Sequence, residues 1–182
     1  LPRMYSNSPP HVQRYREVTG LREGEKPSFV DNMEFMLKHQ MGWMYMRYFL
    51  WNFAGREGDW QDADWLSISD AFEDVPKQIA ENEGRNNFFM IPLILGIIGM
   101  VFQYSKSKRE FAVVAMLFFL TGIALILYLN SPPIEPRERD YIYVGSYYAF
   151  AIWIGFAVLA LGEVIAKISS KKLGAILGTT LC

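Results

Sequence analysis

The residues best suited to chemistry lie in one short stretch, residues 128–150, with the sequence YLNSPPIEPRERDYIYVGSYYAF. Arg137, Glu138, Arg139 and Asp140 follow one another there, directly after prolines at positions 132, 133 and 136. Because prolines stiffen a loop and prevent a helix from continuing through it, these charges should be held in place. Two arginines in such a loop could clamp a phosphate or pyrophosphate, and the adjacent carboxylates could orient them or act on an acceptor hydroxyl.

The same charges have a second interpretation, in which they only mark the end of an apolar segment. An acid such as Asp140, placed before a helix, stabilises the helix dipole without any catalytic role. The sequence leaves both interpretations open. Glu138 and Asp140 are therefore candidate catalytic carboxylates, and Arg137 and Arg139 are candidates for binding a lipid phosphate.

A third arginine, Arg47, lies in a stretch dense in aromatic residues, FMLKHQMGWMYMRYFLWNF at residues 35–53. Capping signals at Ser28 and Asp31 predict a helix over about residues 30–53. This helix is too polar to span a membrane cheaply, whereas Trp and Tyr favour the headgroup level, so we expect an interfacial helix against the outer leaflet. Arg47 is then a further candidate for a lipid phosphate. A soluble helix that packs an aromatic core is the competing interpretation.

Three apolar runs, at about residues 88–104, 111–129 and 147–166, predict membrane-spanning helices. At about 1.5 Å per residue the first two reach roughly 25 and 28 Å, close to the hydrocarbon thickness of about 30 Å. The third contains one acid, Glu163, which we expect to pair with Lys167 on the cytoplasmic side. Another apolar run starts at Leu173 and predicts the start of a fourth span. The expected fold class is an all-α membrane protein.

Lysine and arginine in the short loops predict the orientation of these spans. The turn after the first span and the segment after the third span are both basic, which places them in the cytoplasm; their cations are Lys106, Lys108, Arg109, Lys167, Lys171 and Lys172. The loop at residues 130–146 and the whole of residues 1–87 are then extracytoplasmic. The chain is therefore expected to divide into an extracytoplasmic segment, 1–87, and a transmembrane region, 88–182.

Composition argues against several other functions. A formal net charge of −1 offers no basic surface for nucleic acid. The single cysteine, Cys182, and two histidines far apart in sequence, His11 and His39, do not form a recognisable metal site, and no cofactor is expected.

Four strings taken together resemble a bacterial family of large polytopic inner-membrane proteins, formerly of unknown function and described as protein O-mannosyltransferase-like. They are LPRMYSNSPPHVQRY, WMYMRYFLWNFAGREGD, GRNNFFMIPLILGIIGMVFQ and YLNSPPIEPRERDYIYVGSYYAFAIWIG. The resemblance implies a C-type glycosyltransferase architecture, with a polyprenyl-phosphate sugar donor and protein acceptors on the extracytoplasmic side.

In enzymes of that architecture the catalytic carboxylate usually lies in the first extracytoplasmic loop. The chain starts without Met and ends within an apolar run, so we expect an internal fragment that lacks this loop. A noncatalytic membrane module that supports envelope assembly or export is the alternative function.

Overall fold

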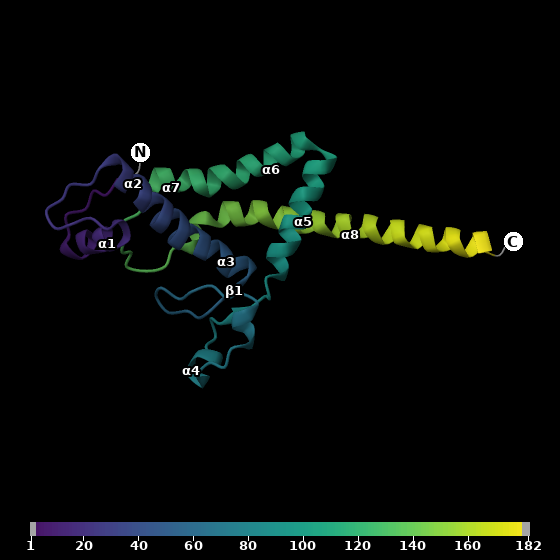
Figure 1. Ribbon diagram of the computed structural model, residues 1–182, viewed down its shortest axis with the longest axis horizontal. Helices are drawn as coiled ribbons and strands as arrows, with labels where there is room; N and C mark the ends of the chain where they lie inside the picture. The colour runs from purple at the N-terminus through teal and green to yellow at the C-terminus, as the bar shows by residue number, and fades with distance from the viewer. Residues whose placement is uncertain (1–2, 180–182) are drawn as a thin grey trace.

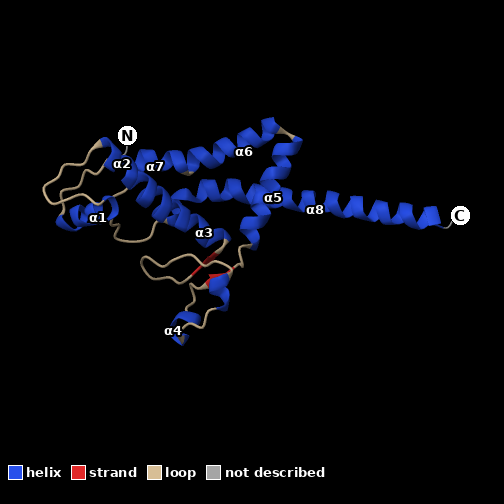
Figure 2. Cartoon of the chain, viewed as in Figure 1, coloured by secondary structure: helices blue, strands red, loops and turns tan. Residues whose placement is uncertain are grey.

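The computed structural model describes residues 3–179 and is mostly helical (Figures 1 and 2). The α-helices are α1 Pro9–Thr19, α2 Phe29–Phe35, α3 Arg47–Phe53, α4 Lys77–Ala80, α5 Ile91–Lys106, α6 Lys108–Thr121, α7 Ile123–Leu129 and α8 Val144–Thr179. A π-helix, η1 Met36–Met46, joins α2 to α3, and two 3-10 helices are η2 Ser69–Phe72 and η3 Asp140–Tyr143. Strands β1 Gly55–Arg56 and β2 Asn86–Asn87 pair antiparallel, with Gly55 opposite Asn87. The expected division after Asn87 falls between β2 and α5.

The predicted aromatic helix is present as the continuous run α2, η1 and α3 (hereafter the aromatic helix). It begins at a capping box: the Ser28 hydroxyl accepts from the Asp31 N–H at 3.3 Å, and the Asp31 carboxylate accepts from the Ser28 N–H at 2.7 Å. The sequence therefore located this helix and its start correctly.

The expectation that the rings of this helix lie among lipid headgroups is wrong for most of them. The buried hydrophobic side chains of its second half are Met44, Tyr45, Tyr48, Phe49, Trp51 and Phe53, in one cluster with residues of α7, η3 and α8. Phe49 packs edge-on against Phe150 of α8 at 4.8 Å between ring centroids, and the Tyr45 hydroxyl donates to Ser146 Oγ at 3.3 Å. Because these rings pack against one another and the Tyr45 hydroxyl has its partner inside the chain, the helix forms an aromatic core, as in the competing interpretation.

Two helical segments are long and apolar enough to cross a membrane, Lys108–Leu129 and Asp140–Ile168. They correspond to the second and third expected spans. The first expected span is the shorter α5, which crosses α8 in Figure 1. At the crossing the helices are in backbone contact, since a Cβ on Gly99 would lie 1.7 Å from the Trp153 carbonyl oxygen. The Trp153 indole N–H donates to Gln103 Oε1 at 2.7 Å beside it.

The expected turn into a fourth span is absent from the described backbone. α8 instead continues as a single helix to Thr179, through Leu173 where the new span was expected to start. Residues 167–179 contain no proline and several strong helix formers, so nothing local ends the helix. Residues 180–182 lie outside the described part of the chain.

The N-terminal segment and the 130–146 loop lie at the same end of the molecule (Figure 1). The Arg3 N–H donates to Asn130 Oδ1 at 3.1 Å, and Gln40 Nε2 donates to the Ser131 carbonyl at 2.8 Å. Toward the other end, Lys106 Nζ lies 2.7 Å from Glu163 Oε1, so the acid within the third apolar run pairs with α5.

Candidate functional site

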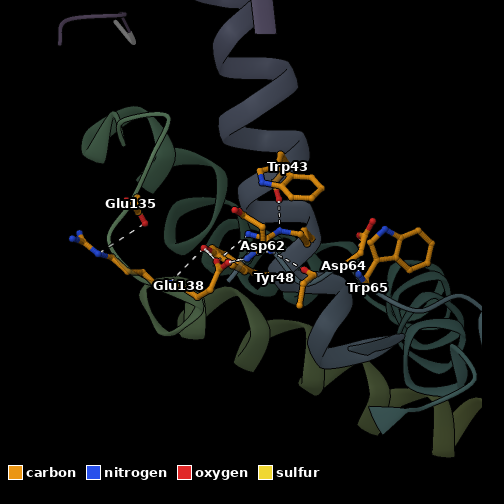
Figure 3. A network of polar contacts seen from close by, with 10 residues as sticks. Trp43, Tyr48, Asp62, Asp64, Trp65, Glu135 and Glu138 are labelled. Atoms are coloured by element: carbon orange, nitrogen blue, oxygen red, sulfur yellow. Dashed lines mark hydrogen bonds and ion pairs between the residues drawn. The ribbon is translucent and has the colours of Figure 1, made fainter. Parts of the chain in front are cut away.

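The charged loop is fixed to the aromatic helix by Glu138 (Figure 3). Arg47 Nη2 lies 2.9 Å from Glu138 Oε2, and Arg47 Nη1 donates to Oε1 at 3.3 Å. The Tyr48 hydroxyl also donates to Oε2, and the Asp62 backbone N–H donates to Oε1 at 2.7 Å. Four hydrogen bonds from two distant segments therefore hold this one carboxylate.

Arg47 is the buried centre of this arrangement, with a side chain only 3% exposed. Its Nε donates to the Trp43 carbonyl at 3.2 Å, and Nη1 also donates to the Ala63 carbonyl at 2.8 Å. The guanidinium carbon lies 4.5 Å from the centroid of the Trp43 ring and 4.8 Å from that of Trp51. Stacking on aromatic faces and a two-point contact to a carboxylate are the geometry that suits arginine rather than lysine.

The electrostatic surroundings make Glu138 a fixed anion. Burial by itself would raise its pKa, but hydrogen bonds from Tyr48, the Asp62 backbone and Arg47 outweigh burial and hold the pKa below its usual value. The pKa of the Tyr48 hydroxyl is raised by burial and by the adjacent Glu138, so Tyr48 remains a proton donor in its hydrogen bond. Glu138 is thus poorly suited to accept a proton during a reaction.

Glu135 is the second buried carboxylate of the loop, and its surroundings are different. Its side chain is 6% exposed, and the nearest cation, Arg139, approaches with Nε at 3.9 Å from Oε2, too far for a hydrogen bond. Among the described residues, neither of these two atoms has a hydrogen-bond partner. Burial raises the pKa of Glu135, and the charge of Arg139 offsets that only in part.

A small cavity of about 20 Å³ lies between the loop, the aromatic helix and the turn at residues 61–62. Glu135 and Glu138 line it from the loop, and His39, Trp43 and Arg47 from the aromatic helix. Burial and the charge of Arg14 lower the pKa of His39 to about 4, so the ring is neutral at pH 7. Among the described residues no group of three or more His, Cys, Asp or Glu side chains could hold a metal ion.

The structure brings together some of the predicted site residues and separates others. Arg47 and Glu138 form one ion pair, which leaves Arg47 few donors for a lipid phosphate. Arg137 is exposed, and Arg139 has a side chain 39% exposed. Asp140 begins η3, directly before α8, where an acid complements the helix dipole. The binding of a lipid phosphate by Arg137, Arg139 and Arg47 stays a prediction.

Sequence reasoning missed four residues of this site: His39, Tyr48, Asp62 and Glu135. Tyr48 is adjacent to Arg47 and Glu135 is within the proline-rich loop, so their neighbourhood was recognisable. No sequence signal connects Asp62 to Glu138, 76 positions away. The left-handed backbone of Asp62, with φ of 62°, aims its N–H at the carboxylate, and local sequence does not predict such a conformation.

Comparison with known proteins gives one match, over residues 1–37, to DUF8416, a family of unknown function. The matched segment includes α1 and α2 and contacts the loop through Arg3 and Asn130. No curated protein and no solved structure matches the chain.

Proposed function

We propose that this chain is part of an integral membrane glycosyltransferase-like protein, in which the 130–146 loop binds the phosphate of a polyprenyl-phosphate sugar donor. The sugar is transferred to protein acceptors on the extracytoplasmic side. The observation that carries the proposal is the anchoring of Glu138, which fixes the loop while its two neighbours, Arg137 and Arg139, keep accessible guanidinium groups. The reaction class, sugar transfer, comes from the resemblance of four sequence segments to the protein O-mannosyltransferase-like family.

The position of these arginines suits a lipid-linked anion. They immediately precede Asp140–Ile168, a segment apolar enough to cross a membrane, so their charges would lie at the level of lipid phosphates. A guanidinium binds phosphate through paired N–H donors, and a preordered arginine loses less entropy on binding. In this proposal the polyprenyl chain lies along the apolar helices and the sugar faces the cavity side of the loop.

The proposed location is the bacterial inner membrane, with the loop and residues 1–87 extracytoplasmic. The hydrogen bond between Arg3 and Asn130 supports this, because it places the N-terminal segment and the loop at the same end of the molecule. The α5–α6 turn lies away from that end and is basic, so the positive-inside rule assigns it to the cytoplasm. We propose α5 as a third, short span, because it is apolar and packs against α8 through Gly96 and Gly99. Sixteen residues extend about 24 Å.

The test is to replace Arg137 and Arg139 with glutamine in the full-length protein and to measure two quantities. These are glycosylation of extracytoplasmic proteins in cells and binding of polyprenyl phosphate by the purified protein. Both should fall by about tenfold or more, since each charge-assisted hydrogen bond contributes about 1.5–3 kcal/mol. Arg14→Gln, which removes an exposed pair with Glu17 on α1, is the matched control.

Unchanged glycosylation in the double variant, at normal protein level, would remove the loop from the site. That result would favour the alternative, a noncatalytic membrane module that supports envelope assembly or export. In that alternative the Arg47–Glu138 pair has a structural role only.

A further inference from the structure

Three exposed phenylalanine side chains lie near the start of α5. Phe72, the last residue of η2, is 79% exposed, and Phe88 and Phe89, which precede α5, are 39% and 44% exposed. The ring centroids of Phe72 and Phe89 are 6.2 Å apart. These three residues are named the phenylalanine patch. Large apolar side chains that are grouped and exposed in this way mark a contact surface.

The backbone before α5 holds two of these rings at the surface. The Phe88 N–H donates to the Ala54 carbonyl at 3.0 Å, and the Phe89 N–H donates to Asn87 Oδ1 at 2.7 Å. Phe89 and Met90 both have left-handed backbone, with φ of 53° and 56°. Bulky residues rarely adopt this conformation. The exposure of the rings therefore belongs to a defined backbone structure.

The phenylalanine patch adjoins the exposed apolar face of α5. The side chains of that face are spaced by three or four residues and are 38% to 61% exposed: Ile91, Ile94, Ile98 and Val101. The glycines that contact α8, Gly96 and Gly99, lie on the opposite side of the helix. If α5 spans the membrane, its exposed face contacts lipid, and the phenylalanine patch lies at the extracytoplasmic end of that face.

The contacts between α5 and α8 give the level of the patch relative to the charged loop. Gly99 packs beside Trp153, and Lys106 pairs with Glu163, so the two helices run in the same direction. α5 starts eight residues before Gly99, and an equal distance before Trp153 reaches the start of α8. The patch is therefore level with the beginning of Asp140–Ile168, a segment apolar enough to cross a membrane.

We propose that the phenylalanine patch inserts into the outer leaflet of the membrane, at the boundary between lipid headgroups and acyl chains. This inference rests on the proposed placement of α5 as a span and extends the membrane contact to residues 55–90. The Asp62 N–H of the same segment donates to Glu138 at 2.7 Å. Insertion of the patch thus holds the charged loop at the level of the headgroups.

The charge of this segment indicates which lipid surface it fits. Residues 55–90 contain three Lys or Arg against nine Asp or Glu, so anionic headgroups repel the segment. Burial of the rings must therefore drive the contact, and phenylalanine is among the residues that insert at membrane interfaces. The partner is a lipid surface rich in zwitterionic headgroups.

The test measures the depth of single spin labels in the full-length protein, reconstituted in phosphatidylcholine vesicles. The labels are attached to Phe72→Cys, to Ile98→Cys on the exposed face of α5, and to Gln78→Cys, which is exposed on α4, after replacement of the native cysteines. Oxygen concentrates in lipid, whereas a nickel chelate stays in water. The label at position 72 should respond to oxygen, like that at position 98, and the label at position 78 should respond to nickel.

A second substitution tests whether the rings cause the insertion. Phe89→Asn removes a ring but keeps a residue that tolerates left-handed backbone. It should raise the nickel response at position 72 by about tenfold, the effect expected when one buried phenylalanine side chain is lost. Phe29→Asn, which removes an exposed ring on α2, is the matched control and should leave the response unchanged. Phosphatidylglycerol in the vesicles should raise the nickel response at position 72 and not at position 98.

The pattern of the labels separates the possible failures. Nickel response at position 72 with oxygen response at position 98 would overturn the insertion and leave the α5 span in place. Nickel response at both positions would overturn the insertion and the proposed membrane placement of α5 together. A label at position 72 that is shielded only after an acceptor protein is added would identify a protein-docking surface, which also overturns the proposal.

Discussion

The buried ion pair between Arg47 and Glu138 should be a major contributor to the stability of the loop, and Glu138→Gln tests this. Removal of one partner leaves the other charge buried, which costs about 3–5 kcal/mol in known cases. Glu138 is 13% exposed and Arg47 keeps the Trp43 and Ala63 carbonyls as acceptors, so the lower end applies. We expect a loss of about 3 kcal/mol in the free energy of unfolding.

The assay is unfolding by sodium dodecyl sulfate in mixed micelles, followed by tryptophan fluorescence. Trp43 and Trp51 report directly, because their ring centroids lie 4.5 and 4.8 Å from the Arg47 guanidinium carbon. Arg47→Met should cost a similar amount, and the double variant should be less destabilised than the sum of the two by about 2 kcal/mol. Glu34→Gln is the control: it removes an exposed pair with Lys38 and should change the free energy by less than about 0.5 kcal/mol.

Two results would refute this reasoning. One is a Glu138→Gln variant within about 0.5 kcal/mol of the wild type, which would mean that the buried charge finds another partner. The other is strict additivity in the double variant, which would mean that the two side chains do not interact.

Three further predictions concern packing, pH and backbone strain. Gly99→Ala should lose about 1–3 kcal/mol of stability, because its Cβ would lie 1.7 Å from the Trp153 carbonyl oxygen. Gly155→Ala, whose Cβ would have nothing within 4 Å, should be neutral or stabilising. Thermal unfolding in detergent compares the two variants. His39 has a pKa of about 4 in the fold against an ordinary 6.5, so the unfolded chain binds its proton first. Stability should fall between pH 6.5 and 4, by up to about 1.4 kcal/mol per pH unit, and His39→Gln should flatten this part of the measured profile. Asp62→Ala should cost about 1 kcal/mol in denaturant unfolding because φ is 62° there, and Asp62→Gly should cost less, although both keep the N–H that binds Glu138.

Local patterns in the sequence were sufficient to predict the aromatic helix and the long apolar helices, but not α1 or the β1–β2 pair. The capping box at Ser28 predicted the start of the aromatic helix, and the absence of charge over 111–129 predicted a long apolar helix. The sequence did not predict whether the aromatic side of this helix would pack against lipid or against other helices of the chain. A stretch rich in Tyr and Trp is typical both of a helix at the lipid headgroups and of a helix in an aromatic core. The contact of Phe49 with Phe150 of α8, which shows the second arrangement, is visible only in the structure.

Several residues of the candidate site were predicted from the sequence, but the contacts between them were not. Arg47 and the PRERDY loop were both recognised, but the ion pair between them joins positions 91 apart, and no periodicity encodes such a contact. Burial was the other missing information. Glu135 and Glu138 are three residues apart in one loop with similar surroundings in sequence, yet the first lacks a donor at Oε2 and the second accepts four hydrogen bonds.

The charged loop therefore combines two kinds of residue that a loop-wide substitution would confuse. Glu138 holds the loop in position, so its loss should reduce stability and, through the altered geometry, activity. Arg137 is exposed, so its substitution should leave stability unchanged and affect only what binds there. If a variant loses both function and a few kcal/mol of stability, the replaced residue holds the loop in position, as Glu138 does. If a variant loses function at wild-type stability, the replaced residue takes part in binding, as is proposed for Arg137. Stability must accordingly be measured together with activity for each variant of this loop, because activity alone assigns Glu138 and Arg137 to the same role.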